Sequence, residues 1–289
     1  MIKKILLPLD GSDAAEEVIP YGEELAKNLG AEVILFHTCV PEYRLACNMH
    51  RLYLVKTAEL LQERLNKTCP GGAPKVQAEF LRGDFATSLT DFVAARDIDL
   101  VVMAAHGFTS IRVRKTGSVA DKIFRLLQCP SLLIRNGDTE RRGKKKLMNR
   151  ILVPLDGSKG AEAALPLVSE LAGKLKAEVC LFSMAARVFL AGDVEDTKSN
   201  NASKRRTAGY LGEIEARFKK EGIKVSSAAG LGNDVAAAIE EAVKAYDTDL
   251  VVMATRGRSP STAWAPGSIA HKMLNTGDLP LLIVNKTED

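Results

Sequence analysis

The sequence predicts an α/β fold that is present twice in one chain of 289 residues. Residues 99–107 (DLVVMAAHG) return almost unchanged at 249–257 (DLVVMATRG), and residues 5–12 (ILLPLDGS) return at 151–158 (ILVPLDGS). Short apolar runs alternate with longer amphipathic segments in both copies, which is typical of parallel strands joined by helices. We therefore expect two doubly wound domains, each a five-stranded parallel sheet with helices on both faces, related by a pseudo-two-fold axis.

The first repeat alternates strand and helix signals along its whole length. Strands are expected at 5–9, 33–37, 77–81, 100–104 and 131–134, and the first of these is a short, continuous apolar run, as is typical of a strand buried on both faces. Asp13 and Glu16 begin an amphipathic segment that Gly30 ends, so one helix is expected there. Further helices are expected at 52–65, 85–96 and 118–127.

The second repeat has the same order of elements. Its strands are expected near 151–155, 178–182, 224–228, 250–254 and 281–284. One segment differs, because residues 193–206 are polar and rich in Asn and Lys. We expect this segment to be mobile, either lying over a site or having no role.

The two repeats place the domain boundaries at 1–138 and 147–289, with a basic linker at 139–146. Residues 135–150 carry seven Lys and Arg, more than the net charge of +4 of the whole chain. The remainder is slightly acidic, so this run predicts an exposed connector and no nucleic-acid partner.

The sequence indicates a cytoplasmic protein that has no membrane partner. No apolar stretch is long enough to span a bilayer, and residues 1–4 lead directly into a strand. The five cysteines include no Cys-x-x-Cys pair, which fits a reducing compartment.

The chemistry is expected beyond the carboxyl ends of the parallel strands, where ligands bind in open α/β sheets. Asp10 follows the first strand and Gly107 the fourth, so the fold brings both to this edge. Gly117 and Ser118 begin a helix, whose free N–H groups attract anions. Ser118 could equally be a simple N-cap. Together these residues outline a phosphate cradle.

The pattern Ala104-x-x-Gly107-x9-Gly117–Ser118, with Asp-Gly-Ser after the first strand and Cys-Pro before the last, resembles the universal stress protein family. The second repeat has Ala254-x-x-Gly257-x9-Gly267–Ser268 in the same place. The resemblance covers essentially the whole chain, as a tandem two-domain member with the ATP-binding type of Gly loop. In both repeats Ala replaces the first Gly of that loop.

The resemblance implies two sites for ATP, with Mg²⁺ as a candidate companion ion. Asp10 and Asp156 correspond to an adenosine-side contact, and Thr38 and Met184 to a backbone contact with adenine. The first site would comprise Pro8, Asp10, Thr38, Ala104, His106, Gly107, Phe108, Gly117, Ser118 and Val119. The second would comprise Pro154, Asp156, Met184, Ala254, Arg256, Gly257, Arg258, Gly267, Ser268 and Ile269. It is the weaker of the two, because Pro260 and Pro266 restrict its loop.

Two further groups of residues have alternative interpretations. His106 could contact a phosphate or act as a general base, but no orienting carboxylate is visible, so no catalytic residue is assigned. His37, Cys39, Cys47 and His50 include zinc-ligand types, but their spacing matches no standard finger. We expect ordinary buried or surface cysteines and no metal, and the sequence leaves that question open.

Three functions are compatible with these residues. We expect a stress-response regulatory protein that binds ATP as a ligand with little or no turnover. The alternatives are a slow nucleotide hydrolase using the same pocket and a ligand-free interaction scaffold. The resemblance also implies that the two halves of the chain pair as an intrachain pseudo-dimer, which could form a further homodimer. The protein partner is not identified by the sequence.

Overall fold

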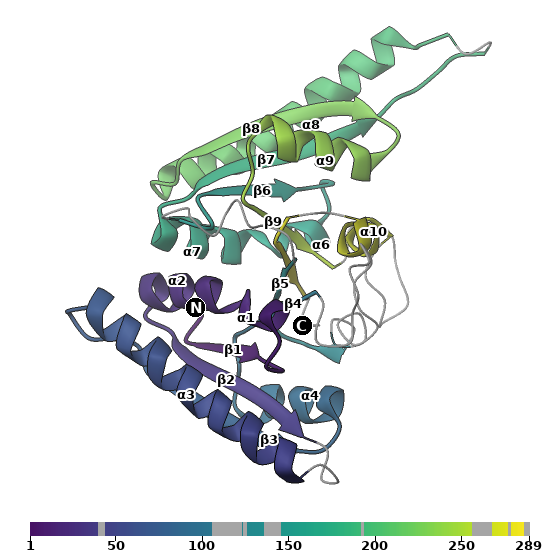
Figure 1. Cartoon of the computed structure of the whole chain (residues 1–289). Helices are drawn as coiled ribbons and strands as arrows, with labels where there is room; N and C mark the ends of the chain where they lie inside the picture. The colour runs from purple at the N-terminus through teal and green to yellow at the C-terminus, as the bar shows by residue number, and fades with distance from the viewer. Residues whose placement is uncertain are drawn as a thin grey trace. The chain divides into compact units, whose positions relative to one another are not determined.

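The computed structural model describes residues 1–39, 44–105, 123, 126–135, 146–191, 194–255, 268–276 and 279–285. The chain divides into two compact units, Met1–Leu147 (unit 1) and Met148–Asp289 (unit 2), as Figure 1 shows by colour. No helix within these ranges is both long and apolar enough to cross a bilayer. Most of the expected linker at 139–146 lies outside the described residues, so the linker and the pseudo-two-fold relation stay predictions.

Unit 1 is a parallel sheet with the strand order β3-β2-β1-β4-β5. Its elements are β1 (Lys4–Pro8), α1 (Asp13–Glu16), α2 (Ile19–Leu29), β2 (Glu32–Cys39), α3 (Arg44–Thr68), β3 (Val76–Arg82), α4 (Phe85–Ala95), β4 (Leu100–Ala104) and β5 (Ser131–Ile134). Ile5 of β1 lies beside Val33 of β2 and Leu100 of β4, so β1 is central.

Unit 2 repeats this arrangement with the parallel order β10-β9-β6-β7-β8. Its elements are β6 (Arg150–Pro154), α6 (Lys159–Glu162), α7 (Leu165–Leu175), β7 (Glu178–Ala186), α8 (Thr197–Lys220), β8 (Val225–Gly232), α9 (Val235–Ala245), β9 (Leu250–Ala254), α10 (Ser268–Thr276) and β10 (Leu281–Val284).

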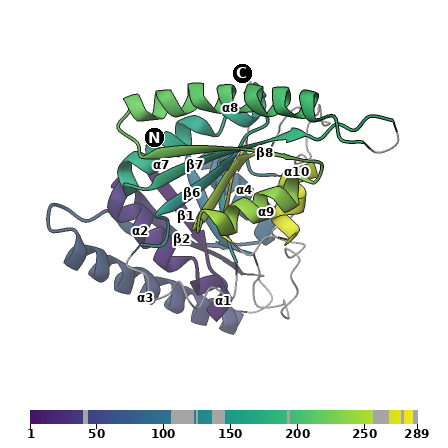
Figure 2. The same cartoon turned by 90° about the horizontal axis from the view of Figure 1, so that it is seen from above.

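Helices cover both faces of each sheet, which confirms the predicted fold class. In unit 2, α8 packs on β7 and β8 from one side and α9 from the other (Figure 2). In unit 1, α3 packs on β2 and β3 and contacts α2, while α4 packs on β2. The central strands are accordingly buried along their length, as their continuous apolar sequences predict.

Two expectations about the helices are wrong in detail. The first amphipathic segment is two helices, because Pro20 lies in the first turn of a new helix, α2. α3 begins at Arg44 rather than at 52.

The polar segment at 193–206, expected to be mobile, contains the start of α8. The Asp196 side chain caps this helix by accepting from the N–H of Ser199, and buried Asn200 hydrogen-bonds the backbone of Val188. Side-chain caps and a buried amide thus compensate for the missing apolar residues.

Gly22 brings α2 close to the central strand of unit 1. A Cβ at this position would lie 2.6 Å from Cδ1 of Leu7, which is completely buried. At the corresponding positions of unit 2, Val153 replaces Leu7 and Val168 replaces Gly22. The first repeat therefore pairs a large side chain with a glycine, and the second has two side chains of intermediate size at the same positions.

We predict that Gly22→Ala lowers the free energy of unfolding by about 1–3 kcal/mol, because the added methyl group overfills the contact with Leu7. Adding Leu7→Val should recover part of this loss, giving a coupling energy of about 0.5–3 kcal/mol in a double-mutant cycle. Denaturant unfolding of the wild type, the two single variants and the double variant measures this coupling energy. Gly173→Ala in α7 is the matched control, because a Cβ there meets nothing within 4 Å. If Gly22→Ala and Gly173→Ala had the same effect, the packing argument would be wrong.

Candidate functional site

The carboxyl ends of β1, β2 and β4 bring together the described residues of the first predicted site. β1 lies between β2 and β4, so Asp10, Thr38 and Ala104 gather at one edge of the sheet. Pro8 is the buried last residue of β1, and the other three are partly exposed. In unit 2, Pro154, Asp156, Met184 and Ala254 occupy the same edge of β6, β7 and β9.

A tight turn follows the central strand in both units. One carboxylate oxygen of Asp10 accepts hydrogen bonds from the N–H (3.0 Å) and the hydroxyl (2.6 Å) of Ser12. The Ser12 hydroxyl accepts from the N–H of Ala15 (3.2 Å) and so caps α1. Gly11 has a φ of 82°, which favours glycine at this position. The turn thereby fixes where the Asp10 carboxylate lies.

The same turn recurs in unit 2 with matching geometry. Asp156 accepts from the N–H of Ser158 (2.9 Å), Gly157 has a φ of 81°, and the Ser158 hydroxyl caps α6. The repeated Asp-Gly-Ser sequence therefore has a structural role in both units, in addition to any contact with a ligand.

β2 continues beyond the end of β1 and leaves part of its backbone open. β1 ends at Pro8, opposite Phe36, and the N–H of Leu9 donates to the carbonyl of Phe36 (2.9 Å). In β2 the backbone N–H and C=O groups of every second residue point toward β1. Those of Phe36 do so, and those of Thr38 therefore point to the same side, beyond the end of β1. No described residue hydrogen-bonds to either group. Thr38 thus presents one donor and one acceptor at the carboxyl edge.

Unit 2 has the same open backbone but different side chains around it. β6 ends opposite Phe182, and the N–H of Leu155 donates to its carbonyl (2.8 Å), so Met184 is the counterpart of Thr38. Met184 packs beside the glycines of β8, with its sulfur 3.2 Å from where a Cβ of Gly232 would lie. A long thioether therefore replaces the small hydroxyl of Thr38.

The Gly loops of both predicted sites lie outside the described residues. This applies to His106, Gly107, Phe108, Gly117, Ser118 and Val119, and to Arg256, Gly257, Arg258 and Gly267. In unit 2, α10 begins at Ser268 and continues through Ile269, so a helix starts directly after Gly267. The predicted contacts of these loop residues stay predictions.

A pair of histidines connects the end of β1 to α3. His37 is buried, and its Nδ1 lies 2.6 Å from the carbonyl oxygen of Leu9. Since a carbonyl only accepts, Nδ1 of His37 carries the proton and donates. His37 Nε2 therefore accepts from Nδ1 of His50, 2.7 Å away. The sequence indicates both histidines only as metal-ligand types, and no motif in it predicts their pairing.

The neighbours of His37 explain its titration. Burial lowers the pKa of His37 below its ordinary value of 6.5, and the nearby His50 lowers it further. The hydrogen bond to the Leu9 carbonyl raises the pKa by more than His50 lowers it, and the charge of Asp10 raises it slightly, but burial is the largest influence. Phe80 covers the ring, with centroids 5.7 Å apart. His37 is therefore held in its neutral form.

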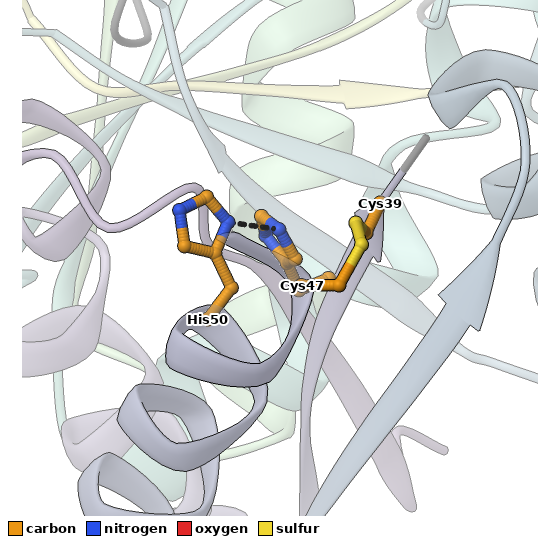
Figure 3. Close-up of a disulfide and its surroundings, with 4 residues drawn as sticks. Cys39, Cys47 and His50 are labelled. Carbon is orange, nitrogen blue, oxygen red and sulfur yellow. Dashed lines mark hydrogen bonds between the residues drawn. A yellow bond between two sulfur atoms is a disulfide. The ribbon is translucent and has the colours of Figure 1, made fainter. Parts of the chain in front are cut away.

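Cys39 and Cys47 form a disulfide, which corrects the expectation of separate thiols (Figure 3). Cys39 ends β2 and Cys47 lies in the first turns of α3, near His50. Their Cα atoms are 5.6 Å apart. No group of three metal-ligating side chains is found among the residues that the structure describes. Unit 2 has Ser183 and Ala185 at the positions of His37 and Cys39, so neither feature is repeated there.

We predict that acidification destabilises the protein partly through His37. Because the folded-state pKa is lowered, the unfolded chain takes up a proton first as the pH falls below about 6.5. Stability is thus full above this value and decreases down to the folded-state pKa. His37→Gln keeps a donor for the Leu9 carbonyl and removes the titration. Urea unfolding at about pH 7.5 and 5.5 should show that the free energy of unfolding decreases less in the variant than in the wild type. Equal losses in both proteins would contradict this account.

Comparison with known proteins agrees with the duplicated architecture. The family model of the universal stress protein family matches the chain twice, at residues 1–135 and 148–285. A universal stress protein of Methanocaldococcus jannaschii is 26% identical over 147 residues, covering 48% of this chain and 86% of its own length. One from Thermus aquaticus is 29% identical over 138 residues, covering 47% of this chain and 100% of its own length.

A solved structure has the same fold over nearly the whole chain. The universal stress protein of Archaeoglobus fulgidus DSM 4304 superposes with a TM-score of 0.70 at 19% identity, covering 98% of both chains. Two matches of the family model, one in each compact unit, account for the internal repeat. The chain belongs to the universal stress protein family, as a tandem member with two family domains.

Proposed function

We propose that this protein is a stress-response regulator that binds ATP as a ligand at the carboxyl edge of unit 1, with little or no turnover. The observation that carries the proposal is the open backbone of Thr38, beside Asp10 at the end of β1. One donor and one acceptor, side by side on an otherwise buried strand, match the Watson–Crick edge of adenine. The family's Gly loop follows β4, which lies beside β1.

The proposed binding mode divides the nucleotide among three parts of the edge. The N–H of Thr38 would donate to adenine N1, and its C=O would accept from the amino group. Asp10 would face the sugar, since its turn holds the carboxylate beside the same edge. The phosphates would lie along Gly107, Gly117 and Ser118, where a helix N-terminus attracts anions. The sequence has no Gly-x4-Gly-Lys-Ser/Thr loop, so efficient hydrolysis is not expected.

Unit 1 is the stronger of the two proposed sites. Both units keep the turn and the open backbone, but Met184 replaces Thr38 and fills space beside Gly230 and Gly232. Pro260 and Pro266 also restrict the second loop. We therefore propose ATP in unit 1, and weaker or no binding in unit 2.

We predict that Gly117→Val abolishes ATP binding to unit 1, because a β-branched side chain would crowd the path of the phosphates. Freshly purified protein is denatured, and the released nucleotide is identified by chromatography and related to the amount of chain. The wild type should release about one ATP per chain, the Gly117→Val variant almost none, and the matched Gly267→Val variant as much as the wild type. Equal release by the wild type and Gly117→Val would contradict the proposed cradle.

We also predict that ATP binds more tightly than GTP by about tenfold or more. Guanine presents N1–H to the N–H of Thr38 and O6 to its C=O, so both contacts would become repulsive. Calorimetric titration of nucleotide-free protein with each nucleotide measures the ratio. Thr38→Ala should retain the preference, because the contacts are made by the backbone. Equal affinities for ATP and GTP in the wild type would exclude recognition by Thr38.

A further inference from the structure

A cavity of about 480 Å³ lies between α3 and the edge strand β3 in unit 1. Cys47, Asn48 and Arg51 line it from α3, together with Leu54 and Val55, and residues 78–82 line it from β3. Its walls combine apolar side chains with Cys47 of the disulfide, two arginines (Arg51 and Arg82) and one carboxylate, Glu79, whose charge is paired with that of Arg96 at 3.1 Å. This composition fits a small ligand that is both negatively charged and reactive toward sulfur.

The two arginines flank the disulfide. Arg51 lies one helical turn after Cys47 on α3, and Arg82 of β3 lies opposite Cys39 of β2 in the register of the sheet. Both side chains are exposed, and neither makes a hydrogen bond or an ion pair with another described residue. Two guanidinium groups are therefore available to carboxylates that enter the cavity.

The access to the disulfide is one-sided. Cys39 and Cys47 are both buried, with 7% and 6% of their surface exposed, but only Cys47 lines the cavity. A molecule in the cavity would therefore contact Cys47 and not Cys39, so Cys47 is the expected point of attack and Cys39 the leaving group.

We propose that this cavity is a docking site for a small anionic thiol, which exchanges with the Cys39–Cys47 disulfide. The thiolate attacks Sγ of Cys47, the bond to Sγ of Cys39 breaks, and its electron pair remains on Cys39 as a thiolate. A second thiolate attacks the sulfur of the bound thiol, which releases an external disulfide and the Cys47 thiolate. Two external thiols are oxidised, the protein disulfide gains two electrons, and the protein thiolates take protons from water. The positive charge of Arg51 and Arg82 favours both the entry of the anion and the departing thiolate.

Two of the remaining cysteines are poor competitors for this chemistry. Burial raises the pKa of Cys129 to about 12 and that of Cys180 to about 11, so both stay protonated near neutral pH. A protonated thiol is a weak nucleophile, so neither Cys129 nor Cys180 is expected to compete with an external thiol for the disulfide. This inference concerns sulfur chemistry and does not depend on the binding of ATP.

The test compares an anionic thiol, glutathione, with a cationic one, cysteamine, on the oxidised full-length chain. Reduction is stopped with acid, the thiols are alkylated, and peptides are mapped by mass spectrometry. At equal thiolate concentrations glutathione should reduce the disulfide faster, with the transient adduct on Cys47. Arg51→Gln and Arg82→Gln should each lower the glutathione-to-cysteamine rate ratio about threefold, the effect of a typical exposed ion pair. Lys56→Gln, which removes a charge from α3 outside the cavity, should leave the ratio unchanged.

A second variant keeps the proposal testable if the arginine variants fold poorly. Cys39→Ser retains the Cys47 thiol, which glutathione disulfide should convert to a mixed disulfide faster than it converts Cys69, Cys129 or Cys180. The proposal is overturned by equal glutathione-to-cysteamine rate ratios in the wild type and in a variant that combines Arg51→Gln with Arg82→Gln, or by an adduct that forms mainly on Cys39. A chain whose five cysteines are all free thiols after treatment with glutathione disulfide would overturn it as well.

Discussion

The parallel pairing of β1 with both β2 and β4 is the constraint on which the rest of unit 1 depends. It brings Asp10, Thr38 and Ala104 to one edge, although they are far apart in the sequence. Because β1 stops at Pro8 while β2 continues to Cys39, the same pairing leaves the backbone of Thr38 open and fixes His37 against the Leu9 carbonyl. The open backbone of the candidate nucleotide site follows from this difference in strand length, whereas the histidine pair also requires the side chains that unit 1 alone has at these positions.

The two units show how a duplicated fold can diverge at its functional edge. The Asp-Gly-Ser turn, the strand order and the open backbone after the central strand are kept in both. The core contact of Leu7 with Gly22 has become Val153 and Val168, a redistribution of volume within the same architecture. At the edge, His37 has become Ser183 and Thr38 has become Met184. The backbone framework is shared, and the side chains that would meet a ligand differ.

Sequence patterns predict the strands well and the covalent and polar details poorly. β4 and β5 have the predicted bounds, because continuous apolar runs of five and three residues have few alternatives to a buried strand. The start of α3 differs from the prediction because its first turns mix polar and apolar residues. Buried Cys47 and the disulfide connect this part of the helix to β2, and no periodicity reveals that link. The start of α8 depends on the Asp196 cap and buried Asn200. Within the site, the topology predicts that Asp10 and Thr38 lie at the same edge of the sheet. Whether the backbone of Thr38 is hydrogen-bonded depends on the residue at which β1 ends, and the sequence does not define that residue.

The central claim is that adenine is bound by the backbone of Thr38 at the carboxyl edge of unit 1. A crystal structure of the full chain grown with ATP and Mg²⁺ tests this claim most directly. We expect the adenine ring within hydrogen-bonding distance of the Thr38 N–H and C=O, with the sugar beside Asp10. A nucleotide bound elsewhere on the chain, or an unchanged edge at saturating ATP, would contradict the account.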